Sequence, residues 1–211
     1  MFIAPHFAET DHAPLHELIR AHSFGLLLTV ADGRPFGSHL PFIFDAERGP
    51  HGTLIAHMAR SNPQWRGFDG AAEVLAVFQG PHAYVSPSWY DPTVNAVPTW
   101  NYAVVHAYGV PKIVEDPERV RAMLDRLVAQ HEAGFDTPWS LASQPEAYLA
   151  AMQKGIVAFD IPIARLEGKF KLNQNHGEAN RRGAIAGLKR AGDPLSVQVA
   201  ALMEARETVR R

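Results

Sequence analysis

The chain has 211 residues, of which 46% are hydrophobic and 20% charged, and its formal net charge is −2. This balance is typical of a globular protein with a sizeable core and gives no overall attraction to nucleic acid. The chain contains no cysteine, which excludes disulfides, thiolate catalysis and cysteine-ligated zinc or iron–sulfur centres. No apolar run approaches the roughly 20 residues of a membrane helix, and the N-terminal MFIAPHFAETD does not have the pattern of a secretory signal. We therefore expect a cytoplasmic protein without membrane contact.

The first part of the chain predicts one helix followed by short strands. Thr10 or Asp11 can cap the helix, and Pro14 lies in its first turn. Asp32-Gly33 predicts a hairpin turn between the first two strands. The expected strands of this part cover residues 24–30, 37–45, 53–59 and 72–80, and a short helix beginning at Pro63 interrupts them.

The second part of the chain predicts two strands and four helices. A long strand over 100–115 carries Tyr102, Val104, His106 and Tyr108 on one face. Asp116 caps the next helix and places Pro117 at its first position. The remaining elements are a helical piece around 145–153, strand character over 155–175, and helices over 177–190 and 194–209 separated by Gly192-Asp193-Pro194.

About six strands in mostly meander order favour an antiparallel barrel. Strands and helices do not alternate as in a Rossmann sheet, and neither GxGxxG nor GxxxxGK[ST] is present. The fold class we predict is α+β, mainly antiparallel β, with peripheral helices and a C-terminal helical segment.

Hydrolase and metal chemistry find little support in the residues. There is no G-x-S-x-G motif, and Ser86 and Ser88 near His82 make a weak pattern for a triad. His12 and His16 are spaced i, i+4 on the expected helix, but no histidine motif with a carboxylate at metal-ligand spacing accompanies them. We predict no metal site, while haem ligation by a strand histidine such as His57 or His106 stays open.

Polar residues after the third strand suit a phosphorylated ligand. Arg60, Ser61 and Asn62 follow this strand, and a guanidinium can donate two parallel hydrogen bonds to phosphate. A helix beginning at Ser61 or Asn62 would add free N–H groups. The alternative is that these residues only cap the helix, and the two roles are compatible.

Residues 80–102 combine prolines, aromatic rings and hydroxyls with a single charged residue, Asp91. Prolines limit the conformations that this segment loses on ordering. Tyr84, Trp89 and Trp100 offer flat faces for a ring system, and the hydrogen-bonding groups are Ser86, Ser88, Thr99 and Asn101. A loop packed on a barrel end or on a dimer interface would have the same composition, so both interpretations stay open.

Four motifs in order resemble the PaiB-like family of FMN-binding negative transcriptional regulators: HMARSNPQW, GPHAYVSPSWY, VPTWNYAVVHAYG and GKFKLNQN. The resemblance covers nearly the whole chain. It implies a flavin-reductase-like split barrel that forms a homodimer, with FMN in a cleft between the subunits. It also implies an FMN-binding domain over residues 1–175 and a C-terminal helical extension over 176–211 packed on the same domain. Asn173 stands where serine is expected, so no role is assigned to it.

By motif position, the resemblance carries flavin contacts onto ten residues of this chain: His57, Met58, Arg60, Ser61, Asn62, Gln79, Thr99, Trp100, Lys171 and Gln174. No catalytic residue is predicted, because in flavoenzymes the cofactor itself carries the redox chemistry.

Three functions follow: a flavin-binding regulator with DNA or a regulatory protein as partner, a flavin-dependent oxidoreductase acting on a small molecule, and a haem-binding split-barrel protein. The two C-terminal helices could mimic a helix-turn-helix, with Arg181, Arg182, Lys189 and Arg190 as its cations. However, acidic residues balance Arg206, Arg210 and Arg211 in the final helix, which weakens the case for a recognition helix there.

Overall fold

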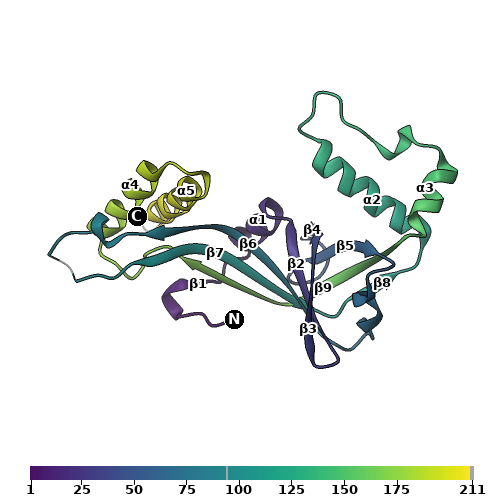
Figure 1. Ribbon diagram of the computed structural model, residues 1–211, viewed down its shortest axis with the longest axis horizontal. Helices are drawn as coiled ribbons and strands as arrows, with labels where there is room; N and C mark the ends of the chain where they lie inside the picture. Colours follow the sequence, from purple (N-terminus) through teal and green to yellow (C-terminus); the bar gives the residue numbers. More distant parts are fainter. Residues whose placement is uncertain (94, 210–211) are drawn as a thin grey trace. The chain divides into compact units, whose positions relative to one another are not determined.

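The computed structural model describes residues 1–93 and 95–209 (Figure 1). Arg210 and Arg211 lie outside the described residues. The strands are β1 Ala8–Glu9, β2 Phe24–Ala31, β3 Arg34–Pro41, β4 Ile43–Asp45, β5 Thr53–Ala59, β6 Val74–Val85, β7 Thr99–Gly109, β8 Lys112–Val114 and β9 Ile156–Lys171. The α-helices are α1 His12–Ala21, α2 Pro117–Glu132, α3 Glu146–Gln153, α4 Glu178–Ala191 and α5 Pro194–Val209. Four short 3-10 helices are η1 Pro5–Phe7, η2 Pro63–Gly67, η3 Pro87–Trp89 and η4 Leu141–Ser143.

The local signals in the sequence place most of these elements correctly. Asp32 and Gly33 have φ of 51° and 72°, so both central residues of the hairpin lie in the left-handed region that a type I′ turn requires. Asp116 accepts a hydrogen bond from Glu118 N and caps α2. On β7 the side chains alternate between buried and half-buried positions, which confirms the predicted shared face of Tyr102 to Tyr108.

Two long strands of the prediction are interrupted in the structure. The strand expected over 37–45 is divided at Phe42, whose N–H donates to Ser23 O at 2.8 Å and whose side chain is fully buried. The strand expected over 100–115 is divided after Gly109, where Pro111 has no N–H to donate. Conversely, the strand expected over 72–80 continues to Val85 as β6.

Within the described residues, the sheet has nine strands. Seven of them follow the hydrogen-bonded order β3-β2-β6-β7-β9-β5-β4, and the other two, β1 and β8, also pair with β9. The described pairs, such as β5 with β9 and β2 with β3, are antiparallel. The chain divides into two compact units. Unit 1 comprises residues 1–18, 79–105 and 167–211, and unit 2 comprises residues 19–78 and 106–166. Among the described helices, none is both long enough and apolar enough to cross a bilayer.

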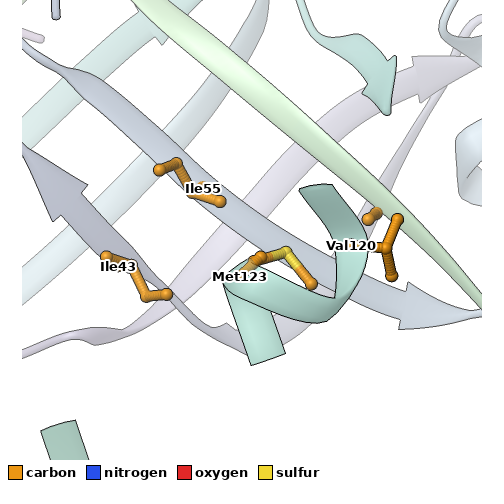
Figure 2. Close-up of a cluster of buried hydrophobic side chains, with 5 residues drawn as sticks. Ile43, Ile55, Val120 and Met123 are labelled. Carbon is orange, nitrogen blue, oxygen red and sulfur yellow. The ribbon is translucent and has the colours of Figure 1, made fainter. Parts of the chain in front are cut away.

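In unit 2, helix α2 packs on the strands β4 and β5. Figure 2 shows Val120 and Met123 of α2 beside Ile55 of β5 and Ile43 of β4. All four side chains are at least nine-tenths buried. Because α2 repeats apolar residues at helical spacing, one face of it can cover the sheet while the other carries charges.

In unit 1, helices α4 and α5 pack against each other (Figure 1). Gly192 between them has φ 74° and ends α4 in the left-handed conformation. Helix α4 also packs on Trp89 of η3, since a Cβ at Gly183 or Gly187 would overlap that tryptophan. Part of the aromatic segment 80–102 is therefore a packing surface for the C-terminal helices, a role that neither interpretation of its composition named.

Candidate functional site

The end of β5 presents the first group of predicted site residues, all in unit 2. Met58 is 2% exposed and belongs to the core, whereas His57 is half-buried and lies on the other face of the strand. Arg60 and Ser61 are exposed just beyond the strand end. The residues available for a ligand at this end are thus Arg60, Ser61 and their polar neighbours.

Backbone carbonyls fix the guanidinium of Arg60. Its Nε donates to Lys154 O at 2.8 Å and its Nη2 to Ile156 O at 2.7 Å. The Arg60 backbone N–H also donates, to Gly155 O at 2.8 Å. Within the described residues, Nη1 of Arg60 makes no hydrogen bond. The side chain is therefore held in place with part of its donor capacity left over for an anion.

The turn after Arg60 is a capped turn, and it offers less to an anion than a free helix end would. Pro63 has no N–H, and Gln64 N donates to Asn62 Oδ1 at 3.0 Å. Asn62 Nδ2 donates to Ser38 Oγ at 2.8 Å. Thus the side chain of Asn62 is engaged at both ends. Ser38, on the neighbouring β3, was not among the predicted residues, because nothing in its local pattern marks it.

His57 carries an unusual polar atom. Its Nδ1 is buried and has no hydrogen-bond partner among the described residues. Burial lowers the pKa of His57 below its ordinary value, so the imidazole is neutral at physiological pH. The ring lines a pocket of about 420 Å³ together with residues of α2, η4 and α3.

Lys171 is the centre of the second group, which lies in unit 1. Its Nζ donates to Thr99 Oγ1 and, at 2.7 Å, to Trp100 O. Burial, together with the neighbouring charge of Lys169, lowers the pKa of Lys171. Lys171 and Thr99 line a pocket of about 580 Å³, whose polar lining also includes Asn95, Asn173, Asn175 and His176. The predicted pair Thr99 and Lys171 is thus brought together in a polar concavity.

Asn173 has a clear structural role, although the sequence suggested none. It is 2% exposed, has φ 62°, and donates from Nδ2 to Tyr90 Oη at 2.8 Å. Asparagine tolerates this left-handed conformation better than most residues. The ring of His176 lies 4.9 Å from that of Tyr90, and burial raises the pKa of Tyr90 while the Asn173 hydrogen bond lowers it.

The other predicted residues of unit 1 differ in how freely they could meet a ligand. Gln174 uses both ends of its amide locally, since Oε1 accepts from Leu172 N at 2.7 Å and Nε2 donates to Phe170 O. Gln79 Nε2 lies 3.3 Å from His82 Nδ1. The indole of Trp100 is 53% exposed, and its centroid is 6.2 Å from the rings of His82 and Tyr84. Trp100 is therefore the exposed flat surface of this group.

An α+β fold of mainly antiparallel strands, with a cation and a hydroxyl in each unit, is what a split-barrel protein of the flavin-binding class would have. The chain belongs to the family described as "Putative FMN-binding domain", which matches residues 1–165. It is also 35% identical to the "Protease synthase and sporulation protein PAI 2" of Bacillus subtilis, over 97% of each chain. The PaiB-like resemblance is thereby confirmed. A protein of Emericella nidulans is 33% identical over 91% of this chain and 92% of its own length.

Solved structures agree on the fold. The FAD and heme binding protein of Mycobacterium smegmatis has a TM-score of 0.61 and 15% identity, over 84% of this chain and 80% of that one. A "putative 5-nitroimidazole antibiotic resistance protein" of Bacteroides thetaiotaomicron has a TM-score of 0.55 and 16% identity, over 77% and 85%. The predicted split-barrel fold is therefore confirmed.

Proposed function

We propose that this chain binds FMN and acts as a PaiB-like negative transcriptional regulator. The observation that carries the proposal is the guanidinium of Arg60, which backbone carbonyls hold while Nη1 makes no hydrogen bond within the described residues; the exposed Ser61 is the next residue in the chain. A phosphate accepts bonds from such a cation and hydroxyl. A donor that is already fixed loses little side-chain entropy on binding.

Unit 1 by itself also offers groups that suit a flavin. Lys171 and Thr99 form a second cation and hydroxyl pair, and the exposed indole of Trp100 offers a face for a tricyclic ring. We propose a cytoplasmic homodimer whose two subunits share the flavin cleft. The exposed aromatic side chains of Tyr84 and Trp100 support this proposal, because covering large apolar groups with a second subunit is energetically favourable.

The flavin supplies two-electron redox chemistry when it is bound. In unit 2, Arg60 and Ser61 would hold the terminal anion of a flavin. In unit 1, the exposed indole of Trp100 would offer a face to a ring system. Lys171 places a positive charge in its polar pocket. Nothing in this arrangement requires an acid or base residue, so a flavin-dependent oxidoreductase acting on a small molecule is the second function we propose.

For the regulatory role, we propose that the contact is with a protein partner or with DNA. The relative in Bacillus subtilis bears the name of a protease synthase and sporulation protein. In the C-terminal hairpin, Arg181, Arg182 and Lys189 pair with Glu207, Glu178 and Glu204, respectively. Because three of the four predicted cations, all but Arg190, are paired within the hairpin, a protein partner is favoured over direct DNA recognition by α4 and α5.

We also propose that residues 176–211 form an extension packed on the flavin-binding domain of residues 1–175. The family match ends at residue 165, and α4 rests on Trp89 through Gly183 and Gly187.

An absorption spectrum of the purified protein, titrated with FMN, FAD and riboflavin in turn, tests the cofactor. We expect a saturable change with FMN and much weaker binding of riboflavin, which has no phosphate for Arg60. Equal affinity for FMN and riboflavin would contradict an anion site, and a haem spectrum would favour the haem-binding alternative. With the flavin loaded, bleaching by NAD(P)H would favour the oxidoreductase, whereas a salt-dependent shift of promoter DNA would favour a DNA-binding regulator.

A further inference from the structure

The pocket that His57 lines in unit 2 lies between β5 and the helices α2 and α3. Its volume of about 420 Å³ falls in the range of small-molecule sites, which is about 300–1,000 Å³. None of the residues lining it, except His57, is among the predicted flavin contacts. It is therefore a separate candidate for a ligand.

The pocket has apolar walls that are partly open to water. Leu141 and Leu149 are buried, while Trp139, Tyr148 and Met152 line the same pocket and are 44%, 53% and 53% exposed. Exposed apolar side chains around a concavity are typical of a binding site, because an occupant removes them from water. Trp139 and Tyr148 favour a flat aromatic occupant.

The polar groups of the pocket indicate a neutral occupant. The guanidinium of Arg121 already pairs with Asp125 at 3.3 Å and Glu146 at 3.1 Å. The imidazole of His57 lies at the wall in a buried setting that disfavours its charge, and the amides of Gln144 and Gln153 also line the pocket. Among the described lining residues, the one charged group is thus balanced, and a phosphate or carboxylate would find no unpaired cation.

The far wall of this pocket is connected to Arg60. Ile156 lines the pocket, and its carbonyl accepts the hydrogen bond from Arg60 Nη2 at 2.7 Å. Gln153 also lines the pocket, and the next carbonyl in the chain, that of Lys154, accepts from Arg60 Nε. A ligand that repositions the end of α3 would therefore move the acceptors that hold the guanidinium.

We propose that the pocket between β5, α2 and α3 binds a small, neutral, aromatic molecule with one hydrogen-bonding group, and that this binding changes the affinity of Arg60 for its anion. The first part stands by itself. The second part rests on the proposed FMN site at Arg60. The pocket then serves as an effector site, through which a metabolite of this class adjusts the flavin affinity of the protein.

The test uses 5-fluoroindole as the probe and fluorine NMR as the measurement, on the full chain without flavin and then saturated with FMN. We expect saturable binding in both states. Met152→Trp, a change at the exposed rim that fills the pocket, abolishes probe binding and retains FMN binding. Phe135→Ala is the control, because Phe135 is exposed and does not line the pocket; it leaves both ligands unaffected.

Several outcomes would overturn the proposal. They are the absence of saturable probe binding, unchanged binding to Met152→Trp, or loss of FMN binding in that variant, which would place the flavin itself in the pocket. Coupling requires that the probe change the Kd for FMN by the same factor as FMN changes the Kd for the probe. An unchanged Kd removes the effector role. If the protein binds no FMN at all, the proposed function fails, while the measurement on the flavin-free chain still decides whether the pocket binds the probe.

Discussion

Both units bury neutral polar residues, but among the described residues only unit 2 also buries a charged one. Unit 2 buries the carboxylate of Asp160, which is 5% exposed and accepts from Arg48 at 2.5 Å and from Arg119 at 3.0 Å. The buried polar residues described in unit 1 are uncharged: Asn101, Asn173, Asn180 and Ser196. A buried charge is tolerated only with close counter-charges, whereas a neutral amide needs only hydrogen bonds.

The cations of the two candidate groups also differ, in how their surroundings hold them. Arg60 of unit 2 is exposed, and two backbone carbonyls hold its guanidinium. Lys171 of unit 1 is partly desolvated, and its charge is sensitive to its surroundings. Unit 2 thus offers a cation that hydrogen bonds hold in place, whereas unit 1 offers a cation whose charge its burial disfavours.

The largest effect should come from leaving the carboxylate of Asp160 without its partners. We expect the double variant Arg48→Gln/Arg119→Gln to lower the free energy of unfolding by about 3 kcal/mol, because an uncompensated charge stays buried. Urea denaturation at neutral pH measures this change. Adding Asp160→Asn should recover most of the loss, and the exposed pair Arg34→Gln/Arg66→Gln is the matched control. If the third substitution restores nothing, the buried charge is not the cause.

The next effect concerns the fixed cation. Arg60→Ala should weaken FMN binding by about 1.5–3 kcal/mol, the range of a charge-assisted hydrogen bond, or roughly ten- to hundredfold in Kd. The FMN affinity of Arg60→Lys should lie between those of the unchanged chain and Arg60→Ala, because an ammonium keeps the charge but cannot reproduce the planar guanidinium fork. Fluorescence titration with FMN measures the three affinities. The exposed Arg66 provides the control, and an Arg66→Ala variant as weak as Arg60→Ala would place the anion elsewhere.

A smaller effect is expected where unit 1 uses neutral groups. Tyr90→Phe removes the hydroxyl that accepts from Asn173 Nδ2, leaving a buried donor without a partner. We expect a loss of about 1 kcal/mol in the free energy of unfolding. Tyr84→Phe, at a 48% exposed position, should change stability by less than about 0.5 kcal/mol. Equal effects of the two substitutions, measured by thermal denaturation, would show that the Asn173 hydrogen bond adds nothing.

The smallest effect is a pH dependence from Lys171. The pKa of Lys171 is lower in the folded chain than the value of about 10.4 for an unfolded lysine. Between these two values the unfolded chain binds more protons, so the contribution of Lys171 to stability rises as pH increases through this alkaline range. Lys171→Gln should remove that rise from the pH profile of the free energy of unfolding. Lys169→Gln, the neighbouring control, should retain most of it, and identical profiles for the two variants would contradict the assignment.

Local patterns were enough to predict much of this protein. The Asp32-Gly33 turn, the Asp116 cap with Pro117, and the strand of residues 53–59 occur as expected, because turn chemistry, capping and side-chain alternation act within a few residues. The four motifs identified the family, and Thr99 with Lys171 proved to be neighbours. The predicted ligand contacts themselves stay predictions.

The tertiary structure decided what depends on partners distant in the sequence. In the fold, Arg60 donates hydrogen bonds to carbonyls more than 90 residues away in the chain. Trp89 packs against two glycines of α4, and Asn173 donates a hydrogen bond to the hydroxyl of Tyr90. The sequence by itself determined the turns, the caps and the family, because turn and cap signals lie within a few residues and the family motifs follow one another in a fixed order along the chain. Only the fold determined which side-chain donors already make hydrogen bonds within the protein and which remain available to a ligand. A hydrogen bond between residues far apart in the chain produces no pattern in the sequence from which it could be predicted.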